Sequence, residues 1–244
     1  MRLDRDDRIG NSRQAFSMFV FLVAAAWTLT AEAQAPADVS VLDRAGCNAC
    51  HLISAPRPDE QTVERHATRK GPDLFYSGAK YRSDWLAAWL AEPRAIRPAG
   101  LHPGDHTKRT PAGDVLDSAP APHPRLASDQ IDEVVKALAA LDWGSEMLPK
   151  TNPELPAMPR MLAELNFSKF KGCGSCHRVT PDGPPLSGPD LFDAWARLRP
   201  EFLASFIAKP QAWDPVAPMP DYGLAPAEVG KLMEYLRLLS EDGR

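Results

Sequence analysis

Apolar residues recur at helical spacing near the end of each half of the chain. Their spacing of three, four and seven positions indicates one buried face of a helix in each case. The positions are Ile131, Val134, Val135, Leu138 and Leu141 in the first stretch, and Val229, Leu232, Met233, Leu236 and Leu239 in the second. Ser128 precedes the first stretch and is expected to cap its helix.

Weaker patterns predict the remaining elements. Val41 and Leu42 begin a short apolar helix, and residues 83–92 form another, with Ser83 as the expected N-cap and Pro93 closing it. Two polar stretches without periodicity are interpreted as loops, one at 54–70 and one at 100–124. The expected fold class is therefore mostly α-helical.

The second half of the chain repeats the first. Residues 71–98 align without a gap on residues 188–215, with 13 identities, and both begin with Gly-Pro-Asp-Leu-Phe. We call this block of five residues the GPDLF block. The repeat indicates two homologous folds within the 244 residues.

The expected domain boundaries follow from composition. Residues 148–159 contain four prolines and are interpreted as a stiff linker between domains at 34–147 and 160–244. Residues 1–33 resemble an export signal with a basic start, an apolar core and a small-x-small cleavage site at Ala31-Glu32-Ala33. We therefore expect a periplasmic mature protein, with an uncleaved membrane anchor as the alternative. The net charge of −4 gives no basis for binding nucleic acid.

The motif Cys-x-x-Cys-His occurs twice and uses every cysteine in the chain. It comprises Cys47, Cys50 and His51 in the first half, and Cys173, Cys176 and His177 in the second. This motif attaches a c-type haem through two thioethers, and its histidine binds the iron. A redox dithiol or a zinc site is the alternative. Zinc ribbons, however, pair their two cysteine motifs roughly 15–20 residues apart, far closer than here.

Each half resembles a class I cytochrome c domain, and the pair resembles tandem dihaem cytochromes of the cytochrome c4 type. The resemblance is carried by the Cys-x-x-Cys-His motifs, the Gly-Pro-x-Leu turns and the C-terminal helices. It implies two covalent haem c groups with His51 and His177 as proximal ligands. It further implies that the carbonyls of Pro72 and Pro189 hold these histidines, and that Met219, in Pro-Met-Pro, is the distal ligand of the second haem. Met233 is the competitor, but it belongs to the apolar face of a helix.

The first half departs from this pattern because residues 57–146 contain no methionine. Three histidines are candidates for its distal ligand: His123, His102 and His106. We favour His123, because Pro122-His123-Pro124 matches the Pro-Met-Pro setting close to the last helix. A forward alignment favours His102 instead, and an open iron is a further alternative. His66 is interpreted as a solvated loop residue.

Other aligned residues have weaker interpretations. Basic residues at Lys80, Arg82, Arg197 and Arg199 could pair with haem propionates. Aromatic residues at i and i+4, namely Trp85, Trp89, Phe202 and Phe206, are expected to pack around the haems.

The expected function is electron transfer between redox partner proteins. A lower-potential bis-histidine haem in the first domain would pass electrons to a higher-potential His/Met haem in the second. The alternatives are a cytochrome subunit of a periplasmic dehydrogenase and a dihaem enzyme, such as a peroxidase with one open haem. The sequence names neither the electron donor nor the acceptor.

Overall fold

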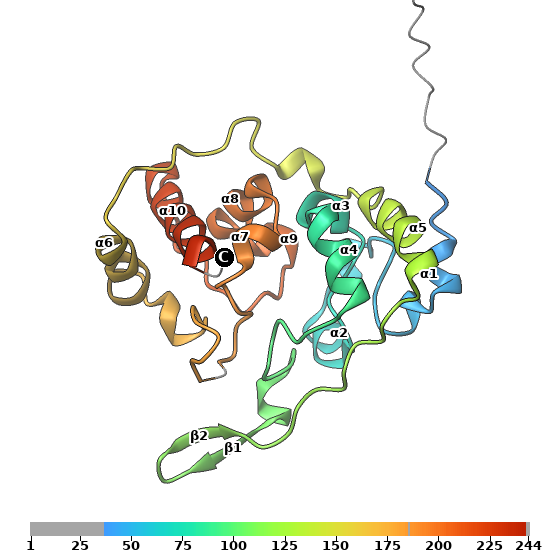
Figure 1. Cartoon of the computed structure of the whole chain (residues 1–244), viewed down its shortest axis with the longest axis horizontal. Helices are drawn as coiled ribbons and strands as arrows, with labels where there is room; N and C mark the ends of the chain where they lie inside the picture. Colours follow the sequence, from blue (N-terminus) through green and yellow to red (C-terminus); the bar gives the residue numbers. More distant parts are fainter. Residues whose placement is uncertain (1–36, 185, 243–244) are drawn as a thin grey trace, which may run out of the picture. The chain divides into compact units, whose positions relative to one another are not determined.

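The computed structural model describes residues 37–184 and 186–242, so the predicted signal segment 1–33 lies outside the described residues. Helices account for 46% of the structure, and the described residues contain a single two-stranded sheet, which confirms the mostly α-helical fold class (Figure 1). No helix in the described part of the chain is both long and apolar enough to cross a membrane.

The helices follow the repeat. Those of the first half are α1 Val41–Arg44, α2 Val63–Thr68, α3 Ser77–Lys80, α4 Ser83–Ala91 and α5 Ser128–Ala139. Those of the second half are α6 Arg160–Leu165, α7 Ala194–Arg197, α8 Pro200–Ala208, α9 Pro210–Trp213 and α10 Pro226–Asp242. A π-helical turn, Asn166–Phe170, continues α6. Short 3-10 turns occur at Cys47–Ala49, Pro58–Glu60, Pro103–Asp105, Ser145–Met147 and Cys173–Ser175.

Four expectations about local structure were right in outline and wrong in detail. The stretch 54–70 contains α2, whose N-cap Thr62 accepts a hydrogen bond from the backbone of Arg65 at 3.2 Å. The stretch 100–124 contains a hairpin of β1 Thr107–Thr110 and β2 Gly113–Leu116, and Gly113 has a positive φ of 119°. Neither serine caps its helix: Arg82 and Ala127 hold the N-cap positions of α4 and α5.

The missed helix and the missed hairpin share a cause. The hairpin is mostly exposed on both faces, so it has no alternation of apolar and polar residues by which it could be recognised. Helix α2 has no buried residue and depends on its cap and its ion pairs. Short elements of this kind leave little hydrophobic signal in a sequence.

Two apolar clusters form the core. The first is built from α1, α4 and α5 and contains Val41, Leu42, Leu86, Leu90, Val134, Ala137 and Leu138. The second surrounds α8 and α10, which lie side by side in Figure 1. It also takes in Phe75, Tyr76 and Ala79 of the first half, with the Tyr76 ring stacked 6.1 Å from that of Phe202. The proline-rich segment 148–159 has no helix or strand before α6, and it packs on this second cluster through Leu148, Leu155 and Met158.

The halves meet at a joint that follows the internal repeat. Tyr81 and Leu198, which are equivalent in the alignment, form an antiparallel bridge. On either side of the bridge, the Arg82 N–H donates to the Arg197 carbonyl at 3.0 Å, and the Arg199 N–H donates to the Lys80 carbonyl at 2.9 Å. Each bond is the counterpart of the other under the repeat, so the joint has approximate two-fold symmetry.

The arginine side chains at the joint obey the same symmetry. The Arg82 guanidinium donates to the carbonyl of Trp195 at 3.2 Å, and the Arg199 guanidinium donates to the carbonyl of Gly78 at 2.9 Å. Trp195 and Gly78 are again equivalent in the alignment. Arg82 and Arg199, considered above as propionate partners, therefore serve to join the two halves.

Candidate functional site

Both Cys-x-x-Cys-His motifs fold into the same turn. Each is a 3-10 turn that follows a glycine in the left-handed region, Gly46 at φ 75° and Gly172 at φ 67°. In both turns the histidine N–H donates to the carbonyl of the first cysteine at 3.0 Å, which links His51 to Cys47 and His177 to Cys173. The two motifs thus present their side chains in the same order from the same local backbone.

The thiols of both motifs are free and unequal in exposure. Cys50 and Cys176 are exposed, while Cys47 and Cys173 are partly buried. Burial raises the pKa of Cys47 and of Cys173, so these thiols are protonated at neutral pH. A reactive redox thiol requires a lowered pKa, and the pKa values of Cys47 and Cys173 shift in the opposite direction.

Each motif histidine is held by the carbonyl that the resemblance implied. The Nδ1–H of His51 donates to the Pro72 carbonyl at 2.7 Å, and that of His177 donates to the Pro189 carbonyl at 2.9 Å. A carbonyl only accepts, so the proton lies on Nδ1 and the Nε2 lone pair is free to bind a metal. Burial lowers the pKa of both histidines, which favours this neutral form.

The glycine of each GPDLF block is required by the histidine beside it. A Cβ atom on Gly71 would lie 2.5 Å from Cε1 of His51. On Gly188 it would lie 2.7 Å from Cε1 of His177 and 2.6 Å from the Cys176 carbonyl. Any side chain at these positions would displace the imidazole. Sequence reasoning missed this role, although the repeated Gly-Pro was a signal for it.

The aspartate of each GPDLF block is buried in an ion pair that the sequence did not predict. Asp73 is 4% exposed and receives Arg65 at 2.8 Å and Arg69 at 3.2 Å, both delivered by the α2 region. Asp190 is 1% exposed and receives both ends of the Arg178 guanidinium, at 2.9 and 2.5 Å. Each aspartate directly follows the proline that holds the histidine, so the ion pair fixes that proline in place.

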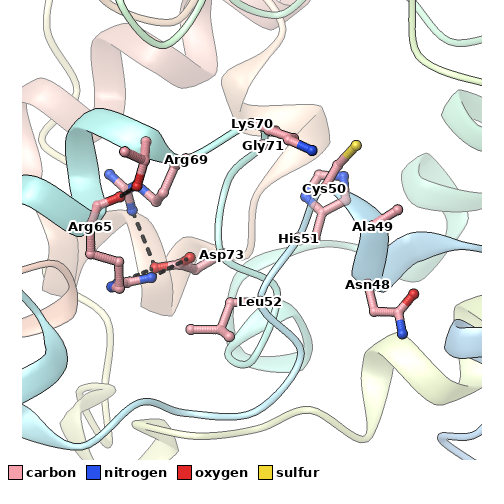
Figure 2. Close-up of a pocket in the computed structure, with 11 residues that line it drawn as sticks. Asn48, Ala49, Cys50, His51, Leu52, Arg65, Arg69, Lys70, Gly71 and Asp73 are labelled. Atoms are coloured by element: carbon pink, nitrogen blue, oxygen red, sulfur yellow. Dashed lines mark hydrogen bonds and ion pairs between the residues drawn. The ribbon is translucent and has the colours of Figure 1, made fainter.

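Figure 2 shows the first of these sites. Arg65 and Arg69 lie on one side of a pocket of 280 Å³ with dashed lines to Asp73, and Cys50 and His51 line its other side. The pocket thus lies between the ion pair and the first Cys-x-x-Cys-His turn.

The three candidate distal histidines of the first half occupy different places. The His123 ring centre lies 6.1 Å from that of His51, and its Nδ1–H donates to the Pro124 carbonyl at 2.7 Å, which leaves Nε2 free. Two imidazoles that bind one metal from opposite sides, with metal–nitrogen bonds of about 2.0 Å, have ring centres roughly 6.3 Å apart. The spacing between the His51 and His123 rings therefore matches a pair of axial ligands.

The other two candidates, His102 and His106, have different neighbours. His102 lies edge-on to His66, with 5.9 Å between ring centres, and its Nε2 faces the carbonyl of Arg69. The Nδ1 atom of His106 contacts the Ser118 hydroxyl at 3.1 Å. His66 is partly buried rather than fully solvated, because α2 places it beside Arg69 and Asp214.

In the second half, Met219 is partly buried against the core. The Gln211 side chain donates to its carbonyl at 2.7 Å, which fixes the Pro-Met-Pro loop. Met233 is completely buried in the core cluster, as expected of the competitor. The pairing of Met219 with His177 stays a prediction.

A row of stacked aromatic side chains leads to the His123 ring. Trp85 stacks between Tyr81 and Trp89, at 5.9 and 5.8 Å between ring centres, and Trp89 contacts the His123 ring at 4.7 Å. Trp85 and Trp89 also line a hollow of 540 Å³ with Ala88, Glu92, Pro93 and Arg94. In the second half, Phe202 and Phe206 stack at 5.4 Å.

No protein-family model matches the chain, and no curated protein or solved structure matches it significantly. The site must therefore be interpreted from its own chemistry. Within residues 37–184 and 186–242, no three His, Cys, Asp or Glu side chains are arranged to bind a metal ion. A haem iron, by contrast, takes only two ligands from the protein.

Proposed function

We propose that this chain is a periplasmic dihaem c-type cytochrome that carries electrons between redox partner proteins. The observation that carries the proposal is the facing pair of His51 and His123, each with Nδ1 bonded to a carbonyl and Nε2 free, beside a Cys-x-x-Cys-His turn. The second turn repeats the bond between the motif histidine and a proline carbonyl, with His177 and Pro189. Covalent attachment through Cys47 and Cys50, and through Cys173 and Cys176, supplies each haem with two thioethers.

The remaining residues fit a flat group with acidic substituents. Gly71 and Gly188 leave room only for an imidazole edge, which fixes the plane of each proximal ligand. Lys80 lies over the Tyr76 and Tyr81 rings, at 5.2 and 5.0 Å, and no carboxylate in the described part of the chain pairs with it. A partly buried ammonium with no carboxylate partner suits a cofactor that brings carboxylates of its own.

The two haems are proposed to differ in potential. In the first half His51 and His123 serve as ligands, and in the second His177 and Met219. Thioether ligation raises a haem potential relative to a second imidazole. The low-potential site therefore belongs to the first half, and electrons pass from it to the second. With both irons six-coordinate, neither offers a free position for a substrate, which favours electron transfer over peroxidase chemistry.

The test begins with haem content and then addresses the ligands. Expression in a host competent for c-type haem maturation is expected to give two covalent haems per chain by mass spectrometry.

His123→Ala is expected to open the first haem, which then becomes high-spin and binds carbon monoxide, while the methionine–iron absorption band of the second haem persists. His102→Ala and His106→Ala are the matched controls and should be silent. A chain without covalent haem would overturn the proposal, and carbon monoxide binding by the unmodified reduced protein would favour the enzyme alternative.

A further inference from the structure

The second Cys-x-x-Cys-His motif is preceded by an apolar surface on α6 and the π-helical turn that continues it. Met161 and Phe170 are 77% and 71% exposed, and Leu162 and Leu165 are exposed as well. The opposite side of α6 packs on α10, with Ala163 completely buried. Soluble proteins scatter single apolar residues over their surface, but a group of such side chains on one short segment marks an interaction site. We call Met161, Leu162, Leu165 and Phe170 the α6 face.

The π-helical turn brings Phe170 into this face. Met161 and Leu165 are four residues apart and are therefore neighbours on one side of the helix. In a regular α-helix Phe170, five positions after Leu165, would point toward the opposite, buried side. The π-helical turn takes up one extra residue, since the Lys171 N–H donates to the Asn166 carbonyl at 3.0 Å, and Phe170 remains on the exposed side. Such turns are rare and occur frequently at functional sites.

The repeated fold does not require the α6 face. Counted back from the first cysteine of each motif, Asp43 and Arg44 of the first half correspond to Lys169 and Phe170 of the second. Arg44 is exposed and forms an ion pair with Asp38 at 3.0 Å. Both motifs fold into the same turn whether an arginine or a phenylalanine precedes it. The exposed phenylalanine therefore has a role other than forming that turn.

Two unpaired charges of opposite sign lie beside the α6 face. Glu164 lies three residues after Met161, on the same side of the helix, and Lys169 follows at the π-helical turn. Both are exposed, and neither forms a hydrogen bond or an ion pair among the described residues, whereas the nearby Lys171 is paired with Glu228 at 3.1 Å. A surface with one acid and one base does not select a partner of either charge. It is complementary to itself, because two copies turned antiparallel bring the acid of each within reach of the base of the other.

We propose that a second copy of this chain binds to the α6 face, related by a two-fold axis that sets the two α6 segments antiparallel. Phe170 of each copy then packs near Met161 of the other, and Glu164 pairs with Lys169. The contact between the two faces buries on the order of 1,000 Å², the size of a weak and transient interface. Dimer formation therefore depends on protein concentration.

The dimer brings the second motifs of the two copies toward each other. The π-helical turn packs against the Cys173–Ser175 turn, so each of these motifs lies close to the shared interface. This gives electrons a route between copies, a consequence that rests on the proposed function, whereas dimer formation itself does not.

The experiment is sedimentation velocity of the purified full-length protein from micromolar to near-millimolar concentration, where a monomer–dimer equilibrium is expected. Phe170→Glu places a charge on the α6 face and should raise the dissociation constant of the dimer about tenfold or more. Because Phe170 is exposed, this variant should keep the fold. Val63→Glu, at a valine of α2 that is 67% exposed, is the matched control and should leave the equilibrium unchanged.

Reversing the two charges tests whether the partner is a second copy. Glu164→Lys and Lys169→Glu each set like charges against each other in a dimer and should weaken it several-fold. A mixture of these two variants should associate as strongly as the unmodified protein, because every charged contact between the copies then joins an acid to a base.

The outcomes separate this inference from the proposed function. A monomer at every concentration would mean that the face meets a different protein, which overturns the inference and leaves the proposed function standing. A dimer that Phe170→Glu leaves intact would place the contact elsewhere and overturn the inference as well. Failure of the mixed variants to associate would refute the antiparallel arrangement. A chain that dimerises through this face but carries no covalent haem would overturn the proposed function alone.

Discussion

The two halves hold the same proximal loop by different means. In the first half, 19 residues lie between His51 and Gly71, and this longer stretch contains α2, whose region supplies Arg65 and Arg69 to Asp73. In the second half only 10 residues lie between His177 and Gly188. Arg178, the residue after the histidine, holds Asp190 through two nitrogens of its guanidinium. The buried carboxylate is thus common to both halves, while the arginine that meets it comes either from an inserted helix or from the residue directly after the motif histidine.

Removing the carboxylates gives the largest expected effect. Asp190→Ala leaves Arg178 unpaired, and loss of one partner of a buried ion pair costs about 3–5 kcal/mol. The loss of stability from Asp73→Ala should lie in the lower part of that range, because Arg69 retains its ion pair with Asp214. Urea unfolding of both variants measures the difference. The exposed Asp114, 3.9 Å from Arg109 in the hairpin, is the control, and Asp114→Ala should change stability by less than about 0.5 kcal/mol.

Replacing the arginines tests whether the two that meet Asp73 can substitute for each other. Arg178→Lys loses the two-point contact with Asp190, and hydrogen bonds to charged groups contribute about 1.5–3 kcal/mol. Arg65→Lys should lose less than about 1 kcal/mol, because Arg69 still meets Asp73. Urea titration gives the free energy of unfolding of each variant, and the two losses are then compared. Equal losses at the two positions would mean that the second arginine of the first half adds nothing.

The glycines test how firmly each imidazole is confined. Gly188→Ala is expected to cost about 1–3 kcal/mol, because the added Cβ meets the Cys176 carbonyl as well as the His177 ring. Gly71→Ala should cost less, since the Cys50 carbonyl is farther away, at 3.2 Å, and the ring can shift. Thermal unfolding of each variant measures both effects. Gly104→Ala, with nothing within 4 Å of the new Cβ, is the matched control and should be neutral.

The smallest expected effect is on the pH dependence of stability, through His66 of α2. Burial, followed by Arg69, lowers the pKa of His66, against the opposing charge of Asp214; His102 and Arg97 lower it further. The unfolded chain therefore takes up a proton before the folded chain does, and this contribution to stability is complete above about pH 6.5 and is lost as the pH falls below it. His66→Asn should flatten the dependence of the melting temperature on pH between about 7 and 5. An unchanged slope would show that the pKa of His66 is the same in the folded and unfolded chains.

The fold was predictable where the chain leaves a periodic or repeated signal. The apolar spacing of 131–141 and 229–239 lies in α5 and α10, and the GPDLF repeat located the two loops that hold His51 and His177. The α2 helix and the hairpin could not be predicted, because neither buries an apolar face. The arginines of the ion pairs were not found either, since nothing in the sequence connects Arg65 or Arg178 to the aspartate that each meets.

The sequence by itself determined the two Cys-x-x-Cys-His turns, because a 3-10 turn is closed by hydrogen bonds between residues three or four apart. It also named three histidines, His123, His102 and His106, as candidates to face His51. Only the tertiary structure placed the His123 ring beside that of His51, because bringing the two together across more than 70 residues of chain depends on how α4 and α5 pack and where Trp89 lies.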